Sequence, residues 1–208
     1  MDIAIPIFDR ITALDAVGPY EVLSRVPGAH VHWVALEARP HTADRGLTIT
    51  AQRTLEDLPA PDVVVVPGGE GNRVLLDDER MLGWLRRAHE HTRFTTSVCT
   101  GSLLLGAAGI LDGLRATTHW ALVDELARYG AEPVADERVV EQGKVITAAG
   151  VSAGIDMALT LAARLTAPEV AQAIQLGIEY DPQPPFDTGT LQKAGPELAG
   201  LVRRAGLD

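Results

Sequence analysis

The strongest indication of the fold is the segment Val63-Val64-Val65-Val66-Pro67-Gly68-Gly69. Four valines in a row, without polar alternation, are typical of a central parallel strand that is buried on both faces. Pro67 and the two glycines end this strand abruptly. On both sides of it, short β-rich runs alternate with longer helical patterns, as in a parallel sheet covered by helices. The sequence therefore predicts an α/β protein with a mostly parallel central sheet.

The same patterns predict the individual elements. Further strands are expected at residues 2–8, 30–36, 93–98 and 144–147, and helices at residues 13–25, 78–91, 101–108, 120–129, 152–165 and 168–179. Small antiparallel additions at a sheet edge are expected at residues 48–51 and for the pair 132–135 and 138–141. Prolines exclude helix geometry for residues 181–186. This segment is expected to form either a lid over a site or a rigid connector to a last short helix near residues 196–204.

Length and composition bound the class of protein. The 208 residues favour a single domain over residues 1–208, with its core at about residues 2–180. A formal net charge of −10 disfavours nucleic acids and anionic membranes as partners. The N-terminus lacks the features of a signal peptide, and no apolar stretch reaches the ~18 residues of a membrane span. We therefore expect a soluble, cytoplasmic protein that binds neither nucleic acid nor membrane.

The single cysteine, Cys99, excludes an internal disulfide and a cysteine-based zinc site within one chain. The histidines show no metal-ligand spacing, so no metal is expected. In residues 94–105 a strand stops at Cys99 and a helix starts at once, which is a nucleophile-elbow pattern. The free N–H groups of the new helix are expected to lower the pKa of the thiol. The alternative is that Cys99 is only a small buried hydrophobic residue.

Three further features of the sequence are candidates for the same site. Asp15 follows the first strand, and either complements a helix dipole or meets Cys99 at the carboxyl edge of the sheet. The glycine-rich segment 67–72 does not match a phosphate-binding P-loop and favours an oxyanion pocket, with the N–H groups of Gly69 and Thr100 as donors. His119 is either a base for the thiol or a structural hydrogen-bonding residue at a helix start.

These motifs resemble the ThiJ/PfpI superfamily of the class I glutamine-amidotransferase-like fold, over roughly residues 2–180. Within it, they are most similar to the isonitrile hydratase branch, at residues 14–21, 66–69, 98–101, 116–120 and 178–186. The resemblance implies a flavodoxin-like three-layer sandwich and a homodimer whose interface lies close to the site. It also implies that Asp15 hydrogen-bonds the Cys99 sulfur as general acid and base, that Thr100 lines the site, and that His119 lies nearby.

Two departures from the superfamily narrow the function. Its proteases and glyoxalase-like members carry a histidine directly after the nucleophile, where this chain has Thr100. Relatives that regulate transcription carry a helix-turn-helix segment after this domain, and we expect none in a chain that ends at Asp208.

The sequence therefore predicts a cofactor-independent hydro-lyase, a carbon–oxygen lyase that adds water to an isonitrile and gives an N-substituted formamide. Cys99 attacks the isonitrile carbon while Asp15 delivers a proton, and water activated by the same carboxylate then releases the product. Two other classes remain open at this point. One is an oxidative-stress sensor in which Cys99 is oxidised without turnover, and the other is a non-catalytic domain that binds a small molecule.

Overall fold

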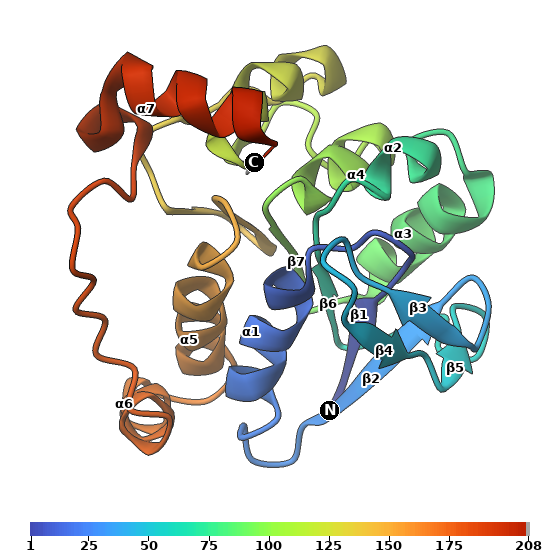
Figure 1. Cartoon of the computed structure of the whole chain (residues 1–208). Helices are drawn as coiled ribbons and strands as arrows, with labels where there is room; N and C mark the ends of the chain where they lie inside the picture. The colour runs from blue at the N-terminus through green and yellow to red at the C-terminus, as the bar shows by residue number, and fades with distance from the viewer. Residues whose placement is uncertain (207–208) are drawn as a thin grey trace. The chain divides into compact units, whose positions relative to one another are not determined.

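The computed structural model describes residues 1–206, and the chain divides into two compact units, Met1–Ile178 and Glu179–Asp208. The first unit holds the central sheet, the helices around it and every residue predicted for the site (Figure 1). In the second unit, residues 181–186 form neither helix nor strand, as their prolines predict. The following helix α7 (Leu191–Ala205) breaks at Gly195, where φ is 74°, so the helix expected at residues 196–204 is the second part of α7.

The central sheet has seven strands in the order β10-β11-β7-β6-β1-β2-β5. Their bounds are β1 (Asp2–Pro6), β2 (His30–Ala35), β5 (Arg53–Thr54), β6 (Val63–Val66), β7 (Phe94–Val98), β10 (Val139–Gln142) and β11 (Val145–Ala148). All neighbouring pairs are parallel except β10 and β11. The run β2-β1-β6-β7-β11 has the flavodoxin-like order 2-1-3-4-5. The predicted α/β fold with a mostly parallel sheet is therefore confirmed.

Helices cover both faces of this sheet (Figure 1). One face carries α1 (Ala13–Leu23), α5 (Ala153–Leu165) and α6 (Pro168–Gly177), and the other carries α2 (Asn72–Leu75), α3 (Glu79–His91) and α4 (Gly101–Ala107). The expected helix at residues 120–129 is present as η1 (Trp120–Tyr129), a 3₁₀-helix that lies against α4. Because both faces are covered, the four valines of β6 are completely buried, as their lack of polar alternation predicts.

The small β additions differ from the prediction. Residues 139–142 do form the antiparallel edge strand β10 beside β11. Residues 48–50, however, form β4 in a separate two-stranded sheet with β3 (Pro40–Thr42), and β9 (Glu132–Pro133) pairs in parallel with β8 (Arg115–Ala116). The antiparallel pairing predicted for residues 48–51 is found at 48–50, although in a sheet of its own, whereas the antiparallel pairing predicted for residues 132–135 is wrong. Such short segments bury little apolar surface, so their own pattern does not select the partner strand, which for β4 is the neighbouring strand of its hairpin.

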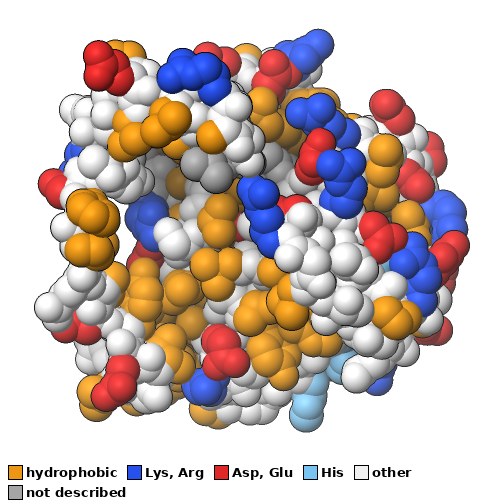
Figure 2. All heavy atoms as spheres, in the orientation of Figure 1, with side chains coloured by type: hydrophobic (Ala, Val, Ile, Leu, Met, Phe, Trp, Pro, Cys, Tyr) orange, Lys and Arg blue, Asp and Glu red, His pale blue; other side chains and the backbone are white. Residues whose placement is uncertain are grey.

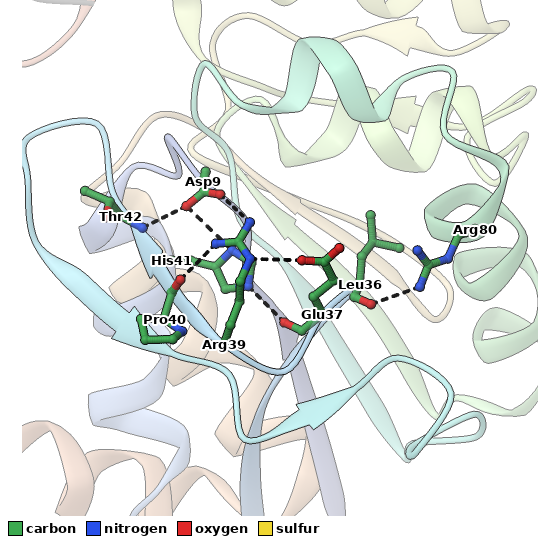
Figure 3. Close-up of polar contacts among 8 residues, drawn as sticks. All are labelled: Asp9, Leu36, Glu37, Arg39, Pro40, His41, Thr42 and Arg80. Atoms are coloured by element: carbon green, nitrogen blue, oxygen red, sulfur yellow. Dashed lines mark hydrogen bonds and ion pairs between the residues drawn. The ribbon is translucent and has the colours of Figure 1, made fainter.

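The hairpin of β3 and β4 is tied to the loop after β1 through Asp9 (Figure 3). Asp9 Oδ1 accepts a hydrogen bond from the Thr42 N–H at 2.9 Å, and Asp9 Oδ2 pairs with Arg39 at 2.6 Å. Buried His41 donates from Nε2 to the carbonyl oxygen of Glu37 at 3.1 Å. These contacts hold the loop that leads from β1 into α1.

Candidate active site

The residues of the site lie at the carboxyl edge of four adjacent strands. Asp15 is reached from β1 through the first turn of α1, Gly68 follows β6, Cys99 follows β7, and Val151 follows β11. In a parallel sheet the segments that leave the carboxyl ends of neighbouring strands converge at one edge. This edge brings Asp15 and Cys99 together, although 84 residues separate them in the sequence.

Cys99 occupies a strained turn between β7 and α4. Its φ is +55°, a left-handed conformation that is uncommon for a residue with a side chain. Its N–H donates to the carbonyl oxygens of Ala148 at 3.2 Å and Ala149 at 3.0 Å. Its own carbonyl oxygen accepts from the hydroxyl of Thr118 at 2.7 Å. These bonds hold the thiol at the strand end, as expected for a nucleophile elbow.

Two glycines permit this turn. A Cβ on Gly101 would overlap the carbonyl oxygen of Val66, so α4 can approach the end of β6 only with glycine there. A Cβ on Gly68 would lie 2.6 Å from both the nitrogen and Oγ1 of Thr100 and 2.8 Å from Oδ2 of Asp15. The absence of side chains at these two positions therefore lets the loop after β6 reach the acid and the elbow.

The Asp15 carboxyl is completely buried beside the Cys99 thiol. Oδ2 accepts a hydrogen bond from the Gly68 N–H at 2.9 Å, and the carboxyl also hydrogen-bonds with the thiol. Among residues 1–206, no nitrogen or oxygen donates to the other oxygen, Oδ1. Burial raises the pKa of Asp15 to about 7, and the nearby charge of Asp44 acts in the same direction. The Gly68 and Cys99 hydrogen bonds lower that pKa and only partly offset the burial.

The pKa of the Cys99 thiol is raised, contrary to the expectation for a helix start. Burial is the largest cause, and the charge of Asp15 adds to it. The N–H groups of Val151 and Thr100 hydrogen-bond the sulfur and do lower its pKa, but they do not outweigh the loss of solvent. The prediction of a lowered thiol pKa is therefore wrong, and the resting cysteine is a neutral thiol that hydrogen-bonds with the Asp15 carboxyl.

The two expected oxyanion donors have different surroundings. The Thr100 N–H faces the sulfur, whereas the Gly69 N–H donates to the hydroxyl oxygen of Thr100 at 2.9 Å. The second N–H at the sulfur belongs to Val151, for which the sequence predicted no role as a backbone donor. Val151 has a φ of +33° and directly follows Gly150 after β11, the strand next to β7. The signal that could have found Val151 was its place after a predicted strand, at the same carboxyl edge as the elbow.

His119 lies against the loop that follows β11. Its Nδ1 accepts a hydrogen bond from the Ala121 N–H at 3.4 Å, as the cap of η1, so the neutral ring carries its hydrogen on Nε2. A Cβ on Gly150 would overlap the imidazole, which shows how closely the ring approaches the backbone beside Val151. His119 thus has the structural role of a helix cap, and its part in chemistry stays a prediction.

Residues 1–206 hold neither a metal-binding cluster nor a membrane-spanning helix. No three His, Cys, Asp or Glu side chains of this part of the chain gather as a metal-binding group. In the same range, every helix is too short or too polar to cross a bilayer.

The fold and the site together define an α/β protein that presents a cysteine, from a strand-to-helix elbow, to a buried carboxyl group. The chain belongs to the DJ-1/PfpI family, which it matches over residues 1–164.

Individual relatives locate the chain within this family. It is 48% identical over 204 residues to the isonitrile hydratase of Pseudomonas putida, covering 98% of this chain and 89% of that protein. It is 33% identical over 171 residues to the HTH-type transcriptional regulator CdhR of Pseudomonas aeruginosa, covering 80% of this chain and 50% of the regulator. A solved ThiJ/PfpI family protein from Pseudomonas syringae superposes with a TM-score of 0.94 at 36% identity, covering 99% of this chain and 86% of that one. The resemblance to the isonitrile hydratase branch is therefore confirmed.

Proposed function

We propose that this protein is an isonitrile hydratase, a lyase that adds water to an isonitrile and releases an N-substituted formamide. The observation that carries the proposal is the buried pair of Cys99 and Asp15, in which the pKa of the carboxyl is raised to about 7. An acid with a pKa near neutrality is able to give and take a proton within one cycle. The similarity to the isonitrile hydratase of Pseudomonas putida, over 98% of this chain, supports the same reaction.

In the first step, the Cys99 sulfur bonds to the isonitrile carbon as the Asp15 carboxyl gives that carbon a proton. The thiol proton passes to Asp15, which regains its acid form, so the product is a neutral thioimidate on Cys99. This route suits a thiol with a raised pKa, because the sulfur loses its proton only as the new bond forms. No free thiolate is needed in the resting protein.

In the second step, water adds to the thioimidate carbon. Asp15, which enters this step in its acid form, gives its proton to the sulfur as the carbon–sulfur bond breaks and takes one proton from the water at its other oxygen. The second water proton ends on the nitrogen, which gives the formamide and restores the thiol. The N–H groups of Thr100 and Val151, which hydrogen-bond the sulfur, stabilise negative charge on it as it leaves.

We propose that neither a metal nor a cofactor takes part, because the thiol, the carboxyl and water alone balance both steps. Gly69 acts in this scheme through the hydroxyl of Thr100, to which its N–H already donates. His119 stays an auxiliary candidate that shapes the loop beside Val151.

We also propose that the chain forms a homodimer in the cytoplasm. Hydrophobic side chains gather over α1 and α5 on one face of the first unit (Figure 2). Leu14 is 41% exposed there, and Val17 and Ile155 are half-buried. A partner that covers this face would lie beside the first turn of α1, which carries Asp15. A thiol that has to stay reduced for turnover suits the reducing cytoplasm.

The proposed function is tested by incubating the protein with a simple alkyl or aryl isonitrile and following formamide by mass spectrometry. The wild-type protein is expected to form formamide, and Cys99→Ala and Asp15→Asn are each expected to lower turnover by at least about 1,000-fold. Asp124→Asn, which changes an exposed acid in the same way, should leave turnover unchanged. Equal rates in all four proteins would contradict the proposal. Oxidation of Cys99 at low peroxide, with no formamide formed, would support the sensor instead.

A further inference from the structure

The hydroxyl of Thr100 is held by two donors, one from the loop after β6 and one from the first residue of α2. Its Oγ1 accepts one hydrogen bond from the Gly69 N–H at 2.9 Å and another from Nδ2 of Asn72 at 3.1 Å. A hydroxyl oxygen has two lone pairs and one hydrogen. Since both lone pairs are occupied, the hydrogen of Thr100 has to point in a third direction.

No acceptor of the described protein lies in that third direction. Among residues 1–206, no acceptor receives a hydrogen bond from the Thr100 hydroxyl. Thr100 is half-buried, whereas Cys99 and Gly101 on either side of it are buried. The hydroxyl hydrogen is therefore left free for a molecule that enters beside the sulfur.

Burial and a backbone hydrogen bond hold Asn72 where its side chain contacts the Thr100 hydroxyl. Its side chain is almost completely buried, and its backbone N–H is anchored to the Gly69 carbonyl oxygen at 3.1 Å. Its Oδ1 is buried without a donor among the described residues. Turning the amide over would leave two buried N–H hydrogens in place of one buried oxygen, so the orientation that donates to Thr100 leaves fewer groups unsatisfied.

We propose that Asn72 is a positioning residue that, with the Gly69 N–H, fixes the Thr100 hydroxyl as a hydrogen-bond donor to the substrate nitrogen. This inference rests on the proposed hydration of isonitriles. The nitrogen of a free isonitrile has no lone pair, whereas the nitrogen of the thioimidate has one. The hydroxyl therefore acts only after the carbon–sulfur bond exists, when water attacks and electron density builds on the nitrogen.

The test compares Asn72→Asp and Asn72→Ala with Thr100→Val and with the double variant Asn72→Asp/Thr100→Val. The carboxylate in Asn72→Asp only accepts, so it turns the Thr100 hydrogen toward residue 72. We expect Asn72→Asp and Thr100→Val to lower kcat by about 10- to 100-fold. The double variant should be no slower than Thr100→Val. Intact mass during turnover should show the thioimidate accumulating on Cys99, and Thr100→Ser should retain most of the wild-type kcat.

A second measurement tests the hydrogen bond between Asn72 and Thr100 in the absence of substrate. In NMR spectra, the side-chain amide signals of Asn72 should shift and exchange faster in Thr100→Val, because their hydrogen bond to Oγ1 is lost. Unchanged amide signals would overturn the inference whether or not the protein hydrates isonitriles. A wild-type kcat in a folded Asn72→Asp would also overturn it, with Asn72→Ala as the replacement where Asn72→Asp does not fold. If the two losses in kcat multiply in the double variant, Asn72 acts independently of Thr100, and the inference is overturned. Wild-type protein that forms no formamide would instead refute the proposed function.

Discussion

At the scale of single residues, Asp15 combines a chemical use with a cost in stability. Its carboxyl is buried, and its pKa is raised from 3.8 to about 7, so the folded protein binds this proton more tightly than the unfolded chain. The contribution of Asp15 to stability is therefore most favourable below pH 3.8 and falls as pH rises to about 7. Above that pH the ionised carboxylate costs the folded state about 4 kcal/mol.

This cost predicts the effect of Asp15→Asn on folding. The amide oxygen is able to keep the hydrogen bond from the Gly68 N–H, while the buried negative charge is removed. We expect the variant to melt above the wild-type protein at pH 8 and to lose this advantage toward pH 4, although it is inactive. Calorimetric melts across this pH range check the prediction. A difference in melting temperature that does not depend on pH would contradict it.

Asp44 is predicted to tune the same carboxyl from the turn of the β3–β4 hairpin. It accepts a hydrogen bond from the Thr12 hydroxyl at 3.0 Å, and its charge raises the pKa of Asp15. In the proposed reaction, kcat/KM falls as pH rises through about 7, because the acid form of Asp15 is lost. Removing the like charge with Asp44→Asn makes Asp15 easier to ionise, so this fall should move to lower pH. The pH profile of kcat/KM measures the shift, and the exposed control Asp124→Asn should keep the wild-type profile.

At the scale of elements, the turn between β7 and α4 depends on close contact with the end of β6. A Cβ on Gly101 would overlap the Val66 carbonyl oxygen, so we expect Gly101→Ala to lower the free energy of unfolding by more than about 3 kcal/mol. Gly177, at the end of α6, has open space around it and serves as the control. Gly177→Ala should change the free energy of unfolding by less than about 0.5 kcal/mol. Urea unfolding measures the free energy of unfolding of both variants. Equal changes in the two would contradict the role of Gly101 in the turn.

At the scale of the whole molecule, the hydrophobic face over α1 and α5 predicts how the proposed dimer is weakened. Leu14→Glu places a charge at an exposed position of α1, so we expect the variant to shift from dimer to monomer while its fold is kept. Val74→Glu makes the same change at a 78% exposed position of α2, on the opposite face of the sheet, and should stay dimeric. Light scattering coupled to size exclusion measures both masses. A wild-type mass equal to one chain would contradict the dimer itself.

Features that depend on local patterns could be predicted from the sequence alone. The unbroken valines of β6 predict a strand buried on both faces, and the run around Cys99 predicts the strand-to-helix turn. Both are found in the structure because periodicity and turn residues act over a few positions of the chain. The meeting of Asp15 with Cys99 was one of two open interpretations of the acid, and it follows from how parallel strands converge.

The remaining features depend on contacts made in the folded protein. The pairing of β9 with β8, the placement of the Val151 N–H at the sulfur and the pairing of the Gly69 N–H with Thr100 all join segments far apart in the sequence, and the hairpin of β4 with β3 forms a sheet of its own. The direction of the thiol pKa was decided in the same way. A helix start favours the thiolate locally, but the solvent removed by packing around Cys99 and the nearby carboxyl oppose it more strongly. Desolvation depends on everything that surrounds a group, and no local pattern in the sequence contains that information.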